Sequence, residues 1–309
     1  MPTESGQFRV AAIGELLWDL MPAGPRLGGT AANFIAMIAA LGDDGFLVSS
    51  IGDDERGQQA LAQMAAHEVG VEYISRDRTH PTGLVTVTLD SKTGPAYRIH
   101  EDTAWDYVAE SPALTDLAPT LDAVCFGTLA QRSSVTRTTL RKFVEDTRAD
   151  CLRVFDVNLR APFWTPEAIV WGCSRAGIVK MNHEEVIPVA EATGAPEDSR
   201  GPLEVARFLL DKFAVRQVAI TRGGNGSLLV TRDEVQDHPG IATKVEDSVG
   251  AGDAFTAALT HSALRGRSLA AMAETANRWG AWVASQPGGM PRVSDETRRK
   301  MGFASGPDR

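Results

Sequence analysis

Short apolar runs alternate with segments of helical periodicity along most of the chain. Each apolar run predicts a buried strand, and the runs occupy residues 8–14, 45–52, 123–127, 152–158, 176–182 and 216–221. Residues 30–41 lie between the first two and have the period of a helix, with an apolar face made of Phe34, Ile38 and Leu41. Residues 55–67 predict a second helix. Alternation of this kind predicts a mostly parallel sheet covered by helices on both faces.

One part of the chain follows a different period. Residues 82–90 (TGLVTVTLD) alternate apolar side chains with threonines, and residues 96–102 (AYRIHED) follow after the turn-like SKTG. This is the pattern of a β-hairpin. We expect an antiparallel insertion above one end of the main sheet. The polar residues 293–309 predict a surface helix or a frayed tail.

Composition sets limits on the class of protein. The chain has 309 residues, of which 43% are hydrophobic and 23% charged, as in a globular protein with a full core. We expect one domain over residues 1–309. The net charge is −9 and the basic residues are scattered, so nucleic acid and anionic membranes are poor candidate partners.

Cysteine usage and the N-terminal segment bear on the compartment. The chain has three cysteines, which cannot all pair and stand in no metal-ligand spacing: Cys125, Cys151 and Cys173. This favours a reducing cytoplasm. The N-terminal segment has an acid before any basic residue and no long apolar stretch, unlike a signal peptide. No run approaches the roughly 18 apolar residues needed to span a bilayer.

A cluster of small residues precedes one acid near the C-terminus. Gly250, Ala251 and Gly252 stand directly before Asp253, and a helix-like segment with a buried side at Phe255 follows. A helix start of this kind binds anions, and an aspartate in its first turn is expected to stay ionised near pH 7, given an ordinary pKa of about 4. An anion site with a carboxylate suits phosphoryl transfer. The alternative is a tight strand-to-helix turn.

Two other phosphate-binding motifs are excluded. A Rossmann fingerprint requires a third glycine at the position of Phe255, and a Walker loop requires Gly-Lys-Ser/Thr, which the chain lacks.

Taken with the rest of the chain, DSVGAGDAF resembles the PfkB (ribokinase-like) carbohydrate kinase signature D-T-x-G-A-G-D-x-F, with Ser248 in place of threonine. The N-terminal GELLWDLMPAGPRLGGTAANF is similar to the glycine-glycine segment of that family, and IGDDERG follows it. Five further matches occur in the order of the family: DVNLR (156–160), KMNHEE (180–185), TRGGNG (221–226), AN (276–277) and GGMP (288–291). The chain is identified as a fructokinase-type member.

The resemblance implies a ribokinase-like three-layer α/β/α sandwich, with a mostly parallel sheet and a small β lid from insertions at about 16–27 and 82–102. It implies an ATP-dependent sugar kinase. Asp253 would be the general base, and Gly250, Ala251 and Gly252 would supply the anion hole.

Further residues would bind the sugar by the same resemblance. Asp19 would hold sugar hydroxyls, although a solvated loop acid is an alternative. Asn33 would bind the same sugar or cap its helix. Gly28 and Gly29 would form a hinge for the lid. Arg160 would meet a phosphate or a sugar acid, or form a structural ion pair.

On the nucleotide side, Asn182 and Glu185 match a motif that orders Mg²⁺ and phosphate largely through water. His183 beside two glutamates is not a transition-metal ligand set. Residues bordering ATP would be Thr221, Gly223 and Gly226, with Asn277 and the Gly288–Gly289 turn around adenine. A monovalent cation, K⁺, near Asp247 and Ser248 is left open.

The lid motifs are most similar to bacterial fructokinases, so fructose is the first choice of acceptor. A 2-keto-3-deoxygluconate kinase is the rival, and would need a cation for the acid from Arg98, Arg132 or Arg160. Ribose comes third. A catalytically silent sugar- or nucleotide-binding protein is a hypothesis of another class. The exposed edges of the hairpin predict a homodimer.

Overall fold

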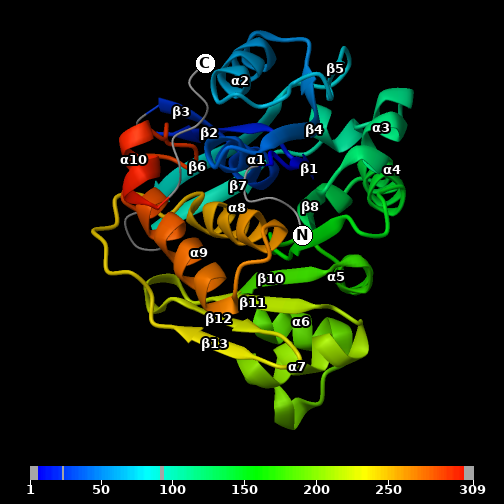
Figure 1. Cartoon of the computed structure of the whole chain (residues 1–309). Helices are drawn as coiled ribbons and strands as arrows, with labels where there is room; N and C mark the ends of the chain where they lie inside the picture. Colours follow the sequence, from blue (N-terminus) through cyan, green and yellow to red (C-terminus); the bar gives the residue numbers. More distant parts are fainter. Residues whose placement is uncertain (1–5, 23, 91–93, 303–309) are drawn as a thin grey trace.

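A nine-stranded sheet forms the centre of the part that the computed structural model describes, residues 6–22, 24–90 and 94–302 (Figure 1). Its order is β13-β12-β11-β10-β9-β8-β1-β4-β5. The strands are β1 (Arg9–Ile13), β4 (Asp44–Gly52), β5 (Ile74–Asp77), β8 (Ala123–Gly127), β9 (Leu152–Asp156), β10 (Ile178–Asn182), β11 (Gln217–Thr221), β12 (Ser227–Val230) and β13 (Val235–His238). All are parallel up to β11, as predicted, and β12 and β13 add an antiparallel edge.

Helices cover both faces of this sheet, each over its own apolar core. One face carries α1 (Thr30–Ala40), α2 (Glu55–Ala66), α8 (Ala251–Leu264) and α9 (Leu269–Ala284). The other carries α3 (Pro112–Leu117), α4 (Ser134–Glu145), α5 (Pro166–Arg175), α6 (Val186–Thr193) and α7 (Pro202–Lys212). These two helical layers complete the predicted sandwich.

The remaining helices are short. The 3₁₀ turns are η1 (Ala104–Tyr107), η2 (Ala118–Thr120), η3 (Leu129–Gln131), η4 (Glu197–Ser199) and η5 (Gly223–Asn225). The predicted C-terminal surface helix is present as α10 (Asp295–Lys300), and residues 303–309 lie outside the described ones. Among the helices of the described ranges, none combines the length and apolar character needed to cross a membrane.

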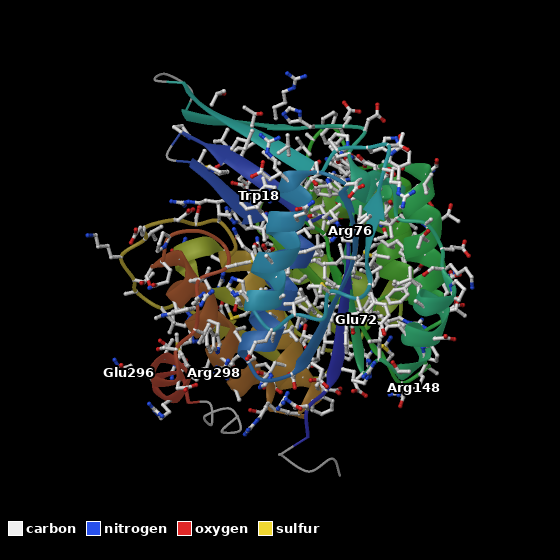
Figure 2. The ribbon with its side chains drawn as sticks, turned by 90° about the horizontal axis from the view of Figure 1, so that it is seen from above. Trp18, Glu72, Arg76, Arg148, Glu296 and Arg298 are labelled. Atoms are coloured by element: carbon white, nitrogen blue, oxygen red, sulfur yellow. The ribbon has the colours of Figure 1, made fainter. Side chains whose placement is uncertain are left out.

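A second, four-stranded sheet, which we call the lid, projects from the main body (Figure 2). Its order is β3 (Gly24–Gly28), β2 (Leu17–Met21), β6 (Gly83–Asp90) and β7 (Gly94–Ile99). The hairpin predicted from alternation is the β6–β7 pair, and β2 joins it in parallel. The lid has a small apolar cluster of its own around Leu17, Val85 and Val87. At its base Trp18 donates Nε1–H to the Arg56 carbonyl at 3.1 Å, which ties the lid to α2.

Candidate active site

Helix α8 begins at a backbone position that only glycine occupies easily. Gly250 is the N-cap residue, with φ 77° in the left-handed region. A Cβ there would lie 2.4 Å from the Cα of Gly289, so a side chain would push the two loops apart. Within the described chain no side chain caps this helix start. Ala251 N–H makes only a long bond of 3.4 Å to the Ser248 carbonyl, and the start of α8 can therefore still bind an anion through its first amides.

Asp253 lies in the first turn of α8, enclosed by several elements. Asn33 Nδ2–H donates to Asp253 Oδ2 at 2.7 Å. Desolvation, followed by repulsion from Asp156, raises the pKa of Asp253 to about 7 against the smaller opposing effects of Asn33, Lys180 and Arg160. The expectation of an ordinary carboxyl pKa is therefore wrong, because enclosure outweighs the helix dipole. A carboxylate of this pKa can accept a proton at neutral pH.

Asn33 is directed at the same place. Its N–H closes the first turn of α1 on the Gly29 carbonyl at 2.8 Å, and the N-cap residue is Gly29, so the capping interpretation is wrong. Its Oδ1 is buried without a hydrogen-bond partner among the described residues. A buried acceptor of this kind requires a donor, such as a ligand hydroxyl. A Cβ on Gly289 would lie 2.9 Å from this amide, so the Gly288–Gly289 turn lies beside Asn33, and its place around adenine stays a prediction.

Asp19 faces the site from the lid strand β2. Burial and the charge of Asp247 raise the pKa of Asp19 to about 6, and Arg160 opposes them. The interpretation as a solvated loop acid is therefore wrong, because the carboxyl lies in a strand and is partly enclosed. A Cβ on Gly28 would lie 2.6 Å from Asp19 Oδ2, so the missing side chain makes room for the carboxylate.

Gly29 is required by close packing as well. Its φ is 109°, and a Cβ would lie 2.3 Å from the Glu15 carbonyl oxygen. A hinge at Gly28 and Gly29 stays a prediction, since the packing alone accounts for both residues.

The three candidate arginines differ in what they contact. Arg160 is exposed, and its charge lowers the pKa of both Asp19 and Asp253, so it faces the space they share. Within the described ranges it forms no ion pair with a carboxylate, so the structural ion pair is not found. Arg132 has a nearly fully buried side chain and pairs with Asp106 at 2.7 Å through Nε and Nη2, whereas its Nη1 has no hydrogen-bond partner among the described residues. Arg98 is exposed on β7, opposite Thr86.

The ends of β9 and β10 meet beneath the start of α8. Asp156 accepts from Lys180 Nζ at 3.0 and 3.1 Å and from Thr256 Oγ1 at 2.8 Å. Asn158, with φ 38°, donates from its amide to Thr30 Oγ1. These contacts tie the D-x-N-x-R segment to helices on one face of the sheet.

Hydrogen bonds between Asn182 and Glu185 close the loop that joins them. Glu185 accepts from the Leu159 N–H at 2.7 Å and from the Asn182 N–H at 2.8 Å, and burial raises its pKa. Asn182 Oδ1 accepts from the N–H groups of Glu184 and Glu185. Among the described residues no group of three or more His, Cys, Asp or Glu side chains could hold a metal ion. The spare lone pairs of this loop suit contact with a hydrated ion rather than direct ligation.

The residues expected at the nucleotide lie around the turn after β11. Thr221 ends β11, and a Cβ on Gly223 would meet nothing within 4 Å, which leaves space for a ligand. Gly226 differs, because its Cβ would lie 2.0 Å from the His238 carbonyl oxygen. Asn277 uses its amide hydrogens on Ser227 Oγ and the Ala273 carbonyl. A contact of Asn277 with adenine stays a prediction, and it would have to be made through the amide oxygen.

The whole chain was then compared with known proteins. The family model described as "pfkB family carbohydrate kinase" matches residues 24–296. The chain belongs to this family. It is 28% identical over 277 residues to a sugar kinase of Pyrococcus horikoshii, covering 84% of each chain, and 25% identical over 303 residues to an Escherichia coli fructokinase, covering 91% of this chain and 95% of the relative.

Solved structures agree with the family assignment. The P. horikoshii kinase in complex with ATP has a TM-score of 0.80 at 26% identity, over 95% of this chain and 99% of that one. A Vibrio cholerae fructokinase has the same fold, with a TM-score of 0.78 at 22% identity over 93% of this chain and 96% of that one. The protein is an ATP-dependent sugar kinase.

Sequence reasoning missed two charged groups of this PfkB kinase. Lys180 stands inside the buried strand IVKMN, and a charge within an apolar run is a signal that could have found it. Arg26 on β3 pairs with Asp247 at 2.6 Å, and Asp247 also accepts from the N–H groups of Val249 and Gly288. Nothing local in the sequence indicates this second pair, whose members are 221 positions apart.

Proposed function

We propose that this PfkB kinase transfers the γ-phosphate of ATP to a primary hydroxyl of fructose, with Asp253 as the general base. The observation that carries the proposal is the enclosed carboxyl of Asp253, whose pKa is raised to about 7 at the uncapped start of α8. The proposed proton acceptor and the proposed anion site thus lie in the same turn of α8. Asn33 and Asp19 provide polar groups on the acceptor side of it.

In the proposed reaction the sugar hydroxyl attacks the γ-phosphorus. Its proton passes to Asp253, the new O–P bond forms, and the bond to the ADP oxygen breaks. The amides at Gly250–Gly252, with the helix dipole, stabilise the charge on the moving phosphoryl group. Acceptance of the proton by a general base typically increases the rate by 10²–10⁴-fold. The positioning of the reactants and electrostatic stabilisation supply the rest of the rate enhancement.

Fructose is supported by the acceptor side and by the relatives. Asp19 can accept from two adjacent hydroxyls, and Asn33 Oδ1 lacks a donor in the described structure. Fructokinases recur among the relatives, but an aminoimidazole riboside kinase of Salmonella typhimurium is also 26% identical over 302 residues. The relatives therefore support a sugar or a sugar derivative as acceptor more strongly than they support fructose itself.

A sugar acid is the second candidate, because Arg160 and Arg98 are exposed cations near the acceptor space and in the lid. Arg132 supports it less, since Asp106 already pairs with two nitrogens of that guanidinium and leaves only Nη1 for an acid. Ribose stays third. A catalytically silent binding protein is disfavoured because Asp253 and the glycines of the anion hole are all present.

Mg²⁺ would be held mainly by the ATP phosphates and water, with Asn182 and Glu185 in contact through that water. It would supply positive charge to the phosphates. A K⁺ held by Asp247 would compete with the guanidinium of Arg26, which already pairs with that carboxylate. A homodimer through the lid edges β3 and β7, and a cytoplasmic location, stay predictions.

The test is ADP release with magnesium-ATP against a panel of ketoses, aldoses, sugar acids and nucleosides. We expect the highest kcat/KM with fructose, and only a small loss with fructose in Arg160→Gln. A sugar acid as the best acceptor, with a selective loss for it in Arg160→Gln, would support the second candidate. ATP binding without turnover of any acceptor would favour the silent protein.

The pH dependence of kcat/KM follows from the raised pKa of Asp253. Only the ionised carboxyl can accept the hydroxyl proton, so activity should rise with pH and level off above about 7. Below that value we expect roughly a tenfold loss per pH unit. The measurement is kcat/KM for the sugar from pH 5.5 to 8.5 at saturating magnesium-ATP, with coupling enzymes in excess. A flat profile down to pH 5.5 would contradict the assignment.

A further inference from the structure

Strand β10 carries a lysine in the middle of an otherwise apolar buried sequence. Val179 and Met181 are fully buried in the core beneath α3 to α7, and Lys180 is only 6% exposed. Because side chains alternate along a strand, Lys180 points to the other face of the sheet, where α8 lies. A buried ammonium is costly unless it is paired, so the position requires an explanation.

The partners of Lys180 join three elements. Its Nζ lies 3.0 and 3.1 Å from the two carboxylate oxygens of Asp156 at the end of β9. Thr256 Oγ1 donates to Asp156 Oδ2 at 2.8 Å and also lies 2.9 Å from the Gly252 carbonyl oxygen, one turn earlier on α8. The ion pair is therefore fixed to the same helix turn that carries the anion hole.

The ammonium also lies close behind that anion hole. A Cβ built on Gly252 would be 3.2 Å from Lys180 Nζ, so the charge sits next to the backbone of Gly252. At this distance in an enclosed site, a positive charge adds to the dipole of α8 for any anion bound at its start.

Both members of the pair act on Asp253. The charge of Asp156 raises the pKa of Asp253, and the charge of Lys180 lowers it. The other groups that face Asp253 are Arg160 from the loop after β9 and Asn33 from α1. The charges of Asp156, Asp253, Lys180 and Glu15 also act on the thiol of Cys125 on β8. Glu185, at the start of α6, faces Lys180.

We propose that Asp156 and Lys180 are positioning residues for phosphoryl transfer: Lys180 places a positive charge beneath the anion hole, and the pair sets how readily Asp253 holds a proton. This inference rests on the proposed role of Asp253 as base. Neither side chain needs to touch the substrate. Asp156 keeps the buried ammonium in place, and Thr256 keeps Asp156 in register with α8.

The test uses opposite changes of charge in the full chain. In Asp156→Asn the repulsion is lost and the ammonium is left unopposed, so the acidic limb of the kcat/KM profile should move to lower pH by about one unit. In Lys180→Met two carboxylates face each other, so the limb should move to higher pH by about one unit, and the plateau should fall by about tenfold. In the double variant the limb should return close to that of the parent.

Asp43→Asn is the matched control, because Asp43 belongs to an equally buried cluster at the other end of α8. It accepts from His261 at 2.7 Å and from Arg265 at 2.8 Å, with its side chain 0% exposed. Thermal unfolding should show a lower Tm in this variant, while its acidic limb stays unchanged. Thr256→Val, which changes no charge, should lower Tm and plateau activity without moving the limb by a comparable amount.

The outcomes separate this inference from the proposed function. If Asp253→Asn is inactive but the two single variants shift the limb in the same direction, or not at all, the pair has a purely structural role and the inference is overturned. If Asp253→Asn keeps full activity, the proposed base is wrong whatever the limb does.

Discussion

Asp253→Asn is expected to lower kcat by between 10² and 10⁴-fold while the affinity for ATP stays nearly unchanged. The amide keeps the size of the carboxyl and can still accept from Asn33 Nδ2, which lies 2.7 Å from Asp253 Oδ2. What it lacks is the ability to take a proton. Removing a half-buried carboxyl of raised pKa also removes an unfavourable electrostatic contribution, so we expect no loss of Tm.

The measurements for this variant are steady-state kcat and calorimetric ATP binding, with Tm as a check of the fold. Asp19→Asn is the comparison, because Asp19 also has a raised pKa but lies on the lid strand. It should mainly raise KM for the sugar. Unchanged turnover in Asp253→Asn would refute the assignment of the base. An equal loss of kcat in both variants would leave Asp253 with only a general role in substrate binding.

The parts of the fold predicted from sequence are those where burial is uniform. A strand covered on both faces shows a continuous apolar run, as β1 does from Val10 to Ile13, and its length separates it from a helix. The edge strand β13 (Val235–His238) is mostly exposed and carries Gln236 and Asp237, so it shows no such run. Strand β3 contains Pro25 and two glycines, and only the resemblance to the family indicated it.

The sequence predicted residue types for the candidate site, but it did not predict the electrostatics around them. The motif around Asp253 is local, whereas its raised pKa depends on Asp156 and Asn33, which other elements bring beside it. The pairing of Arg132 with Asp106, which lies 26 positions earlier in the chain, was not predicted. Such pairs depend on tertiary contacts, which the spacing of residues in the sequence does not predict.

The glycine at the start of α8 allows the anion hole itself to be tested. Gly250 and Gly266 both have left-handed φ, at 77° and 61°, and lie at opposite ends of α8. An alanine at either position costs about 1–3 kcal/mol in backbone strain. They differ in space, because a Cβ on Gly250 would lie 2.4 Å from the Cα of Gly289, and one on Gly266 would meet nothing within 4 Å.

Gly250→Ala is therefore expected to lower kcat by at least about 10²-fold, a loss of the size seen when one donor to a developing anion is removed. To relieve the contact with Gly289, the backbone must move, and the first amides of α8 move with it. Gly266→Ala should lose stability by the strain alone, seen as a lower Tm, with kcat unchanged. If the two variants lose the same stability and both keep kcat, the amides at Gly250–Gly252 do not bind the transferred phosphoryl group. If only Gly250→Ala loses turnover, the close approach of the two loops is what holds those amides in place.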